Sequence, residues 1–99
     1  MIKQKNTLEY MVLDFLRSLV FQEDKTFTSS DLVAYVRGIG RHSFSPESAP
    51  RVLRRANQRS IKAGSGRIYA QTADGFEPLV AGLLGYLMRI NYAPARKYS

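Results

Sequence analysis

Apolar residues recur at helical spacing in the first third of the chain and predict a helix that begins after Thr7 as its N-cap. One face of this helix is apolar along its whole length: Leu8, Met11, Val12, Phe15, Leu16 and Leu19. A second apolar stripe lies on another face: Tyr10, Leu13, Val20 and Phe21. Both apolar faces must be covered, which three short helices are not expected to achieve, so the second stripe, together with the last helix, indicates a further partner surface.

A short extended segment and a second helix follow. Thr26 and Phe27 favour an extended backbone, with Phe27 as the apolar anchor. Thr28 and Asp31 have the spacing of a capping box, with Asp in place of the usual Glu. The pattern predicts a helix over residues 29–37 that is ended by the glycine-rich residues 38–40.

The third helix has two candidate starting points. Residues 45–47 (Ser-Pro-Glu) have the composition of a helix start, with Ser as N-cap and Pro at the first position. Pro50 has the same preference, so the regular helix begins either late or after one irregular turn. It continues to residue 62 or 63, and residues 64–66 (Gly-Ser-Gly) stop it.

A strand, a turn and a last helix complete the pattern. Residues 67–72 predict a strand, and the Asp-Gly pair at 74–75 predicts a turn into a short return strand. Residues 77–78 (Glu-Pro) open a helix over residues 79–90 that is apolar around nearly its whole circumference. Residues 91–99 are polar and are expected to be loosely ordered. The fold class is therefore mainly α with a small β-hairpin.

The third helix divides into two faces of opposite character. Its apolar and small residues fall on one side: Ala49, Val52, Leu53, Ala56, Ser60 and Ala63. The other side collects long polar and basic residues, with Arg59 at the border: Arg51, Arg54, Arg55, Gln58 and Lys62. No acidic residue occurs from Arg51 to Ala73. One face can therefore pack on a core while the other presents guanidinium groups to a partner.

The positive charge of the chain is concentrated in its middle. The net charge is +7, and residues 32–73 alone carry eight basic residues and one acid, again +7. Residues 1–31 carry a net −1 and residues 74–99 a net +1. This distribution favours a polyanionic partner, with nucleic acid ahead of an anionic membrane surface.

The sequence contains no metal-ligand cluster, no nucleophile–base pair and no paired carboxylates at a spacing typical of a catalytic site. There is no cysteine, and the single histidine, His42, cannot build a metal site by itself. The Ser-Ser-Asp cluster at 29–31 has no adjacent base, and helix capping explains it. We expect no enzyme, no cofactor, no metal and no small-molecule ligand.

Two features of the sequence bear on its location. Glu9 and Asp14 interrupt the apolar stretch that a secretory signal would need. The most apolar run, residues 79–88, is about half as long as a membrane-spanning helix. We expect no membrane association and an intracellular protein, cytoplasmic or associated with the nucleoid.

The order of elements resembles a winged helix-turn-helix DNA-binding domain. The residues that carry the resemblance are Phe-Thr-Ser-Ser-Asp-Leu at 27–32, Gly-Ile-Gly at 38–40, Val-Leu-Arg-Arg-Ala at 52–56 and Gly-Arg-Ile-Tyr at 66–69. In that family the helix after the turn enters the major groove, and the following hairpin, the wing, contacts the backbone or minor groove. This chain departs from the family in a longer connection before the third helix and in a short wing.

The resemblance implies one domain over residues 1–99. Residues 7–77 correspond to the winged-helix core, residues 78–90 to an added dimerisation or core helix, and residues 91–99 to a flexible tail. The implied function is sequence-specific binding of double-stranded DNA by a small transcriptional regulator. The helix over residues 50–63 would read the major groove.

Position along the helix divides the candidate DNA-binding residues into two groups. Those near its N-terminus and centre suit base edges: Ser48, Arg51, Arg55 and Gln58. The others suit phosphates: Arg54, Arg59, Lys62 and Arg67. A solvated charged face, an RNA partner and an adaptor that binds an acidic protein are the alternatives that stay open.

The last helix has more apolar surface than one packing partner can cover. The residues expected to join two protomers are Leu79, Val80, Leu83, Leu84 and Leu87. Ala81, Gly82 and Gly85 would permit the close approach of another backbone. A homodimer is the simplest assembly with these properties, and it would place two recognition helices on one DNA site.

Overall fold

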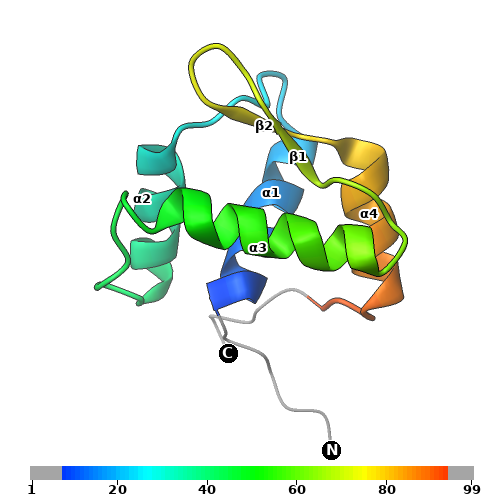
Figure 1. Cartoon of the computed structure of the whole chain (residues 1–99). Coiled ribbons are helices and arrows are strands. Elements are labelled where there is room, and N and C mark those ends of the chain that lie inside the picture. Colours follow the sequence, from blue (N-terminus) through cyan, green and yellow to red (C-terminus); the bar gives the residue numbers. More distant parts are fainter. Residues whose placement is uncertain (1–7, 94–99) are drawn as a thin grey trace, which may run out of the picture.

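The computed structural model describes residues 8–93, which form four helices and one antiparallel hairpin (Figure 1). The elements are α1 (Leu8–Val20), α2 (Ser29–Ile39), α3 (Ala49–Lys62), β1 (Tyr69–Gln71), β2 (Phe76–Pro78) and α4 (Val80–Arg89). This order confirms the mainly α class with a small hairpin. The predicted N-cap Thr7 and most of the predicted tail lie outside the described residues.

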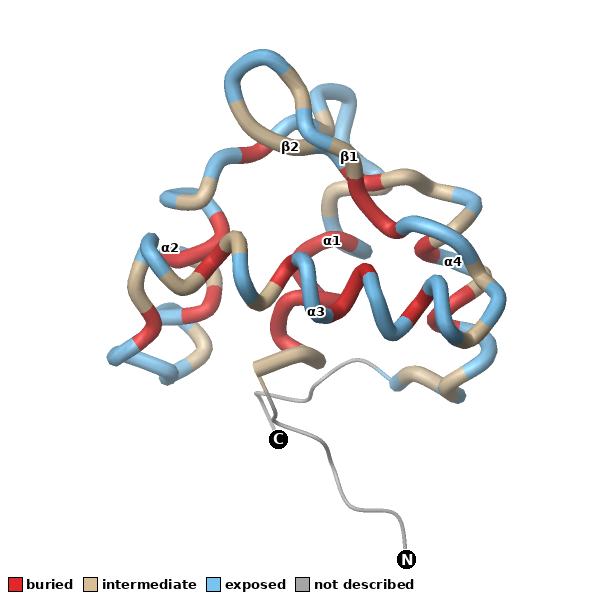
Figure 2. The backbone as a smooth tube through the Cα atoms, viewed as in Figure 1, coloured by how far each residue is buried: buried red, intermediate tan, exposed pale blue. Residues whose placement is uncertain are grey.

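Helix α1 is the centre of the core. It contacts α2, α3, α4 and β2, and its residues from Met11 to Leu16 are all buried (Figure 2). The two apolar stripes are thus covered mainly within the protomer. Phe21, just beyond the helix, is 74% exposed and lies under the guanidinium of Arg17 at 5.8 Å.

Helix α2 begins with the predicted capping box. The backbone N–H of Asp31 donates to Thr28 Oγ1 at 3.2 Å, and the N–H of Thr28 donates to Asp31 Oδ2 at 2.9 Å. The helix runs two residues further than predicted, through Gly38 to Ile39. Gly40 ends it with a φ of +125°, a conformation that side chains disfavour.

The connection between α2 and α3 is anchored by one aromatic side chain. Phe44 is 4% exposed, and its carbonyl oxygen accepts a hydrogen bond from Arg37 Nε at 2.8 Å. Residues 45–48 then form a separate turn, in which the Ser48 N–H donates to the Ser45 carbonyl at 3.0 Å. Helix α3 begins at Ala49 with Pro50 in its first turn, so the structure combines the late start with the irregular turn that precedes it.

Strand β1 is shorter than the strand predicted over residues 67–72. A single β-bridge adds one further residue to the two-stranded sheet. Residues 69–71 pair with residues 78–76 in antiparallel register. On the other edge of β2, Phe27 and Phe76 exchange two backbone hydrogen bonds of 2.8 Å. Phe27 therefore adds a third extended segment to the hairpin.

The start of the last helix differs from the prediction. Pro78 belongs to β2, opposite Tyr69, and α4 begins at Val80. The N–H of Leu79 donates to the Ile68 carbonyl at 2.9 Å, which holds the chain extended for one residue longer. No helix within residues 8–93 has the length and apolar character needed to span a membrane.

Candidate nucleic-acid interface

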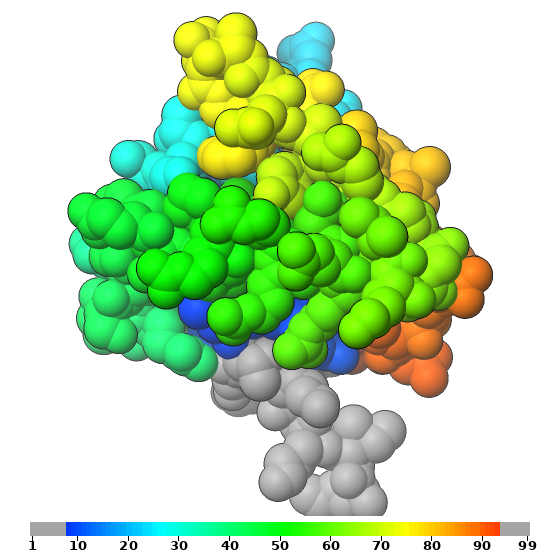
Figure 3. Space-filling view, viewed as in Figure 1, coloured from blue at the N-terminus to red at the C-terminus, as the bar shows by residue number. Residues whose placement is uncertain are grey.

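Helix α3 lies across one side of the molecule and exposes one face along its length (Figures 1 and 3). The exposed residues are Arg51, Arg54, Arg55, Gln58, Arg59, Ile61 and Lys62, which we call the α3 face. The buried ones are Ala49, Leu53, Ala56, Asn57 and Ser60. The predicted separation of an apolar side from a basic side is confirmed.

Two buried polar side chains fix α3 against the segment that follows it. Asn57 Oδ1 accepts a hydrogen bond from the Ile68 N–H at 2.7 Å, and Ser60 Oγ donates to the Gly66 carbonyl at 2.6 Å. Both groups are in the apolar environment where an unpaired polar atom is costly. They therefore specify how far α3 is rotated, and hence which side chains it exposes.

The N-terminal end of α3 is less open than the sequence indicates. Ser48 is half-buried, makes no side-chain cap, and its Oγ lies 3.2 Å from Ser45 Oγ. A base contact by Ser48 would compete with this serine pair. Arg51, one turn further along, is exposed.

The hairpin side of α3 carries two of the predicted phosphate-binding residues. Burial raises the pKa of Tyr69, while the positive charges of Arg54 and Arg67 act in the opposite direction. Arg54 lies on α3 and Arg67 in the segment between α3 and β1, so basic residues continue from α3 toward the hairpin. Both are exposed.

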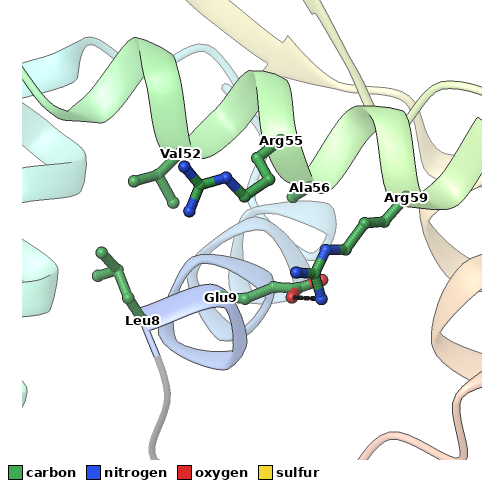
Figure 4. A pocket seen from close by; sticks show the side chains of 6 residues that line it. All are labelled: Leu8, Glu9, Val52, Arg55, Ala56 and Arg59. Carbon is green, nitrogen blue, oxygen red and sulfur yellow. Dashed lines mark hydrogen bonds and ion pairs between the residues drawn. The ribbon is translucent and has the colours of Figure 1, made fainter.

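The other side of α3 meets a carboxylate that the local sequence does not reveal. Glu9, in the first turn of α1, accepts a hydrogen bond from Arg59 Nη1 at 3.0 Å (Figure 4). The spacing of residues within α3 indicated a face without acidic partners, but the structure places one carboxylate beside it. This carboxylate belongs to a residue 50 positions away in the sequence. Arg59 nevertheless keeps 60% of its side chain exposed.

Glu9 also connects α3 to α4. Its second oxygen, Oε2, accepts a hydrogen bond from the Tyr86 hydroxyl at 3.1 Å. The pocket drawn in Figure 4 lies beside this ion pair and is lined by Leu8, Glu9, Val52, Arg55, Ala56 and Arg59. The carboxylate thus holds three helices together at the edge of the α3 face.

Because of this hydrogen bond, we expect the free energy of unfolding to vary with pH in the alkaline range. Burial, followed by the Glu9 carboxylate, raises the pKa of Tyr86 to about 12. The unfolded chain releases this proton near pH 10 and the folded chain does so only near pH 12. The free energy of unfolding should therefore fall across this interval, by up to about 2 kcal/mol from Tyr86.

Urea denaturation of the protein and of Tyr86→Phe at pH 7, 10 and 12 measures this contribution. At pH 7 the variant should be about 1 to 2 kcal/mol less stable, because it loses a hydrogen bond to a carboxylate. Between pH 10 and 12 it should lose less stability than the parent protein. Parallel losses in both proteins would contradict the assignment to Tyr86, since every other tyrosine is common to the two.

Acidic residues gather at the far end of the hairpin. Asp24, Asp31 and Asp74 line a hollow between the hairpin turn and the start of α2. From Ile68 to Pro78 the only charged residues are Asp74 and Glu77. The hairpin beyond Arg67 therefore carries no cation for a phosphate, and a polyanion is favoured on α3 and disfavoured at the hairpin turn.

The remaining candidates have structural roles or no assigned chemistry. Gly64 and Gly66 have φ values of +89° and +84° and end α3, as expected of a helix stop. Tyr35 packs against Phe15 at 5.2 Å between ring centres, and His42 is exposed in the loop before α3. Within residues 8–93 no three acidic or histidine side chains lie close enough to hold a metal ion.

Helix α4 uses most of its apolar surface inside the protomer. Leu83 is fully buried and Leu87 is 6% exposed, so the prediction that these two residues face a partner is wrong. Leu79 and Val80 are half-buried. Of the predicted dimer residues only Leu84, at 40%, is exposed, and its neighbour one turn on, Met88, is 78% exposed.

The close backbone approach predicted for α4 is also internal. A Cβ atom on Gly82 would collide with the carbonyl oxygen of Arg67 and lie 3.3 Å from that of Ser65. Gly85 faces Ser65 at ordinary contact distance. These glycines let α4 pack against the segment that ends α3 and leads into β1.

Comparisons of the chain with protein-family models, curated proteins and solved structures found no match.

Proposed function

We propose that the α3 face binds double-stranded DNA in the major groove and that the protein is a small sequence-specific transcriptional regulator. The observation that carries this proposal is the composition of the face. It presents Arg51, Arg54, Arg55 and Lys62, which form no ion pair with a carboxylate of residues 8–93, and one further arginine, Arg59, that pairs with Glu9. Arginine suits both phosphate and guanine, to which it donates two hydrogen bonds at once.

The dimensions of α3 support this assignment. A helix of 14 residues is about 21 Å long, and with side chains it is about 10–12 Å wide. The major groove of B-DNA is about 12 Å wide and admits one such helix. The element order also supports a winged-helix arrangement, in which the hairpin and the Phe27 bridge form the wing sheet.

Within this proposal the position of each side chain gives it a role. Arg51, Arg55 and Gln58 lie along the middle of the α3 face and would contact base edges, together with Ser48. Arg54 and Arg67 on one side, and Arg59 and Lys62 toward the C-terminal end, would contact phosphates. Since the hairpin turn is acidic, we assign it no DNA contact.

The salt dependence of binding tests the proposal. If the four basic side chains assigned to phosphates neutralise one phosphate each, the logarithm of the affinity should fall with the logarithm of salt concentration with a slope of about −4. Fluorescence anisotropy of the full chain with labelled genomic duplex fragments measures this slope. Polyglutamate and duplex RNA serve as competitors of the same charge sign.

The outcome separates the proposal from its rivals. Tight duplex binding with this slope, resistant to polyglutamate, supports DNA recognition. Absence of binding to any duplex at physiological salt would contradict it, and a protein partner that then co-purifies would favour the adaptor alternative. Preference for the RNA competitor would favour the RNA alternative.

We further propose that the protein binds DNA as a homodimer through the exposed part of α4. Leu84 and Met88, which lie one helical turn apart and are both exposed, support this proposal. A dimer would place two α3 helices in successive major grooves about 34 Å apart. A palindromic binding site would support this assembly, and a single asymmetric site would contradict it.

A further inference from the structure

One residue of the α3 face is apolar. Ile61 is 50% exposed, although isoleucine is among the residues most often buried. It lies on the same side of the helix as Gln58 and Lys62 and is not part of the hydrophobic core. About half of this side chain is therefore accessible to a ligand that approaches the α3 face.

Ile61 lies in a shallow hollow on the exposed side of α3. The other residues that line it are Arg55, Gln58, Arg59 and Lys62. Their stems are chains of methylene groups, and their polar ends can extend away from these stems. The hollow therefore combines an apolar surface with a rim of three cations and one amide.

A ligand that fits this hollow must be polyanionic and must present a small apolar group beside hydrogen-bonding groups. In the major groove of DNA, the C5-methyl group of thymine is such a group, and no other standard base carries one. Gln58, three residues before Ile61, has an amide that suits the N6 and N7 atoms of adenine. The rim cations match the phosphates on either side.

We propose that Ile61 contacts the C5-methyl group of a thymine and thereby selects sites that contain a thymine beneath the C-terminal half of α3. This inference rests on the proposed function. This assigns a base preference to a residue that charge and capping arguments leave without a role. The same contact would favour DNA over RNA, because uracil lacks the methyl group.

The test uses duplexes selected from random DNA by the full chain. Each thymine of the selected site is replaced in turn by deoxyuridine, which removes the methyl group and keeps every hydrogen-bonding group. At one position per half-site the affinity should fall about three- to fourfold, the amount expected for one buried methyl group. Ile61→Ala should bind the thymine and deoxyuridine duplexes equally well, and circular dichroism checks that its helices are intact.

Phe21→Ala is the matched control, because Phe21 is another exposed apolar side chain, lies just beyond α1 and belongs neither to the α3 face nor to the proposed dimer contact. It should keep the parental response to deoxyuridine. The inference is overturned if no replacement weakens binding by the parent protein, or if Ile61→Ala loses as much affinity as the parent does. Failure to select any duplex would overturn the proposed function as well, whereas normal selection without a methyl effect overturns this inference alone.

Discussion

Replacing Arg51 and Arg55 together by glutamate is expected to abolish duplex DNA binding at physiological salt. Both side chains are exposed in the middle of the α3 face, so the replacement removes two cations and adds two anions where phosphates and bases would approach. Each bidentate arginine–base contact contributes about 1–3 kcal/mol, and like-charge repulsion adds to the loss. We expect the affinity measured by anisotropy to fall at least about a hundredfold.

A charge-matched variant separates this local effect from the change in net charge. Arg17→Glu with Lys25→Glu changes the charge of the protein by the same amount, but the two residues lie in α1 and in the loop after it. This variant should lose only the part of the affinity that depends on long-range attraction. If both double variants bind equally, or if the α3 variant binds as the parent does, α3 is not the contact surface.

Gly82→Ala is expected to cause the largest loss of stability from the addition of one methyl group. The new Cβ would collide with the Arg67 carbonyl, which is backbone and cannot rotate out of the way as a side chain can. Helix α4 would have to move away from the segment between α3 and β1. Overpacking of this kind costs about 1–3 kcal/mol and here should be near the upper end.

Gly38→Ala provides the control for helix propensity. Gly38 is also a helical glycine, but an added Cβ would meet nothing within 4 Å. Alanine should stabilise the protein there by about 0.5–1 kcal/mol. Urea denaturation measures both variants, and equal effects of the two substitutions would contradict the packing described for α4.

The helices were predictable because their signals are local. Capping by Thr28 and Asp31, the glycine stop after α3 and the alternation of its faces depend on residues within a few positions of one another. Sequence alone could not resolve where α3 begins within residues 45–50, because Pro46 and Pro50 both suit the start of a helix. The burial of Phe44 and its hydrogen bond with Arg37 decide where the regular helix begins.

The features that the sequence did not reveal depend on distant residues. Glu9 reaches Arg59 and Tyr86 only because α1 packs beneath α3 and beside α4. Leu83 and Leu87 fill the core because Gly82 lets α4 approach Arg67 closely, a contact that composition cannot distinguish from one between protomers. Asn57 and Ser60 gave no functional signal, yet they set the rotation of α3.

The most direct test of the central claim is to map the surface that a duplex touches. Nuclear magnetic resonance spectra of the full chain, recorded during titration with a selected duplex, report each backbone amide and each arginine side chain. We expect the largest chemical-shift changes in α3, at Arg67 and in the loop before Ala49, with little change at Asp74. Changes centred on the hairpin turn or on α4, with α3 unaffected, would contradict it.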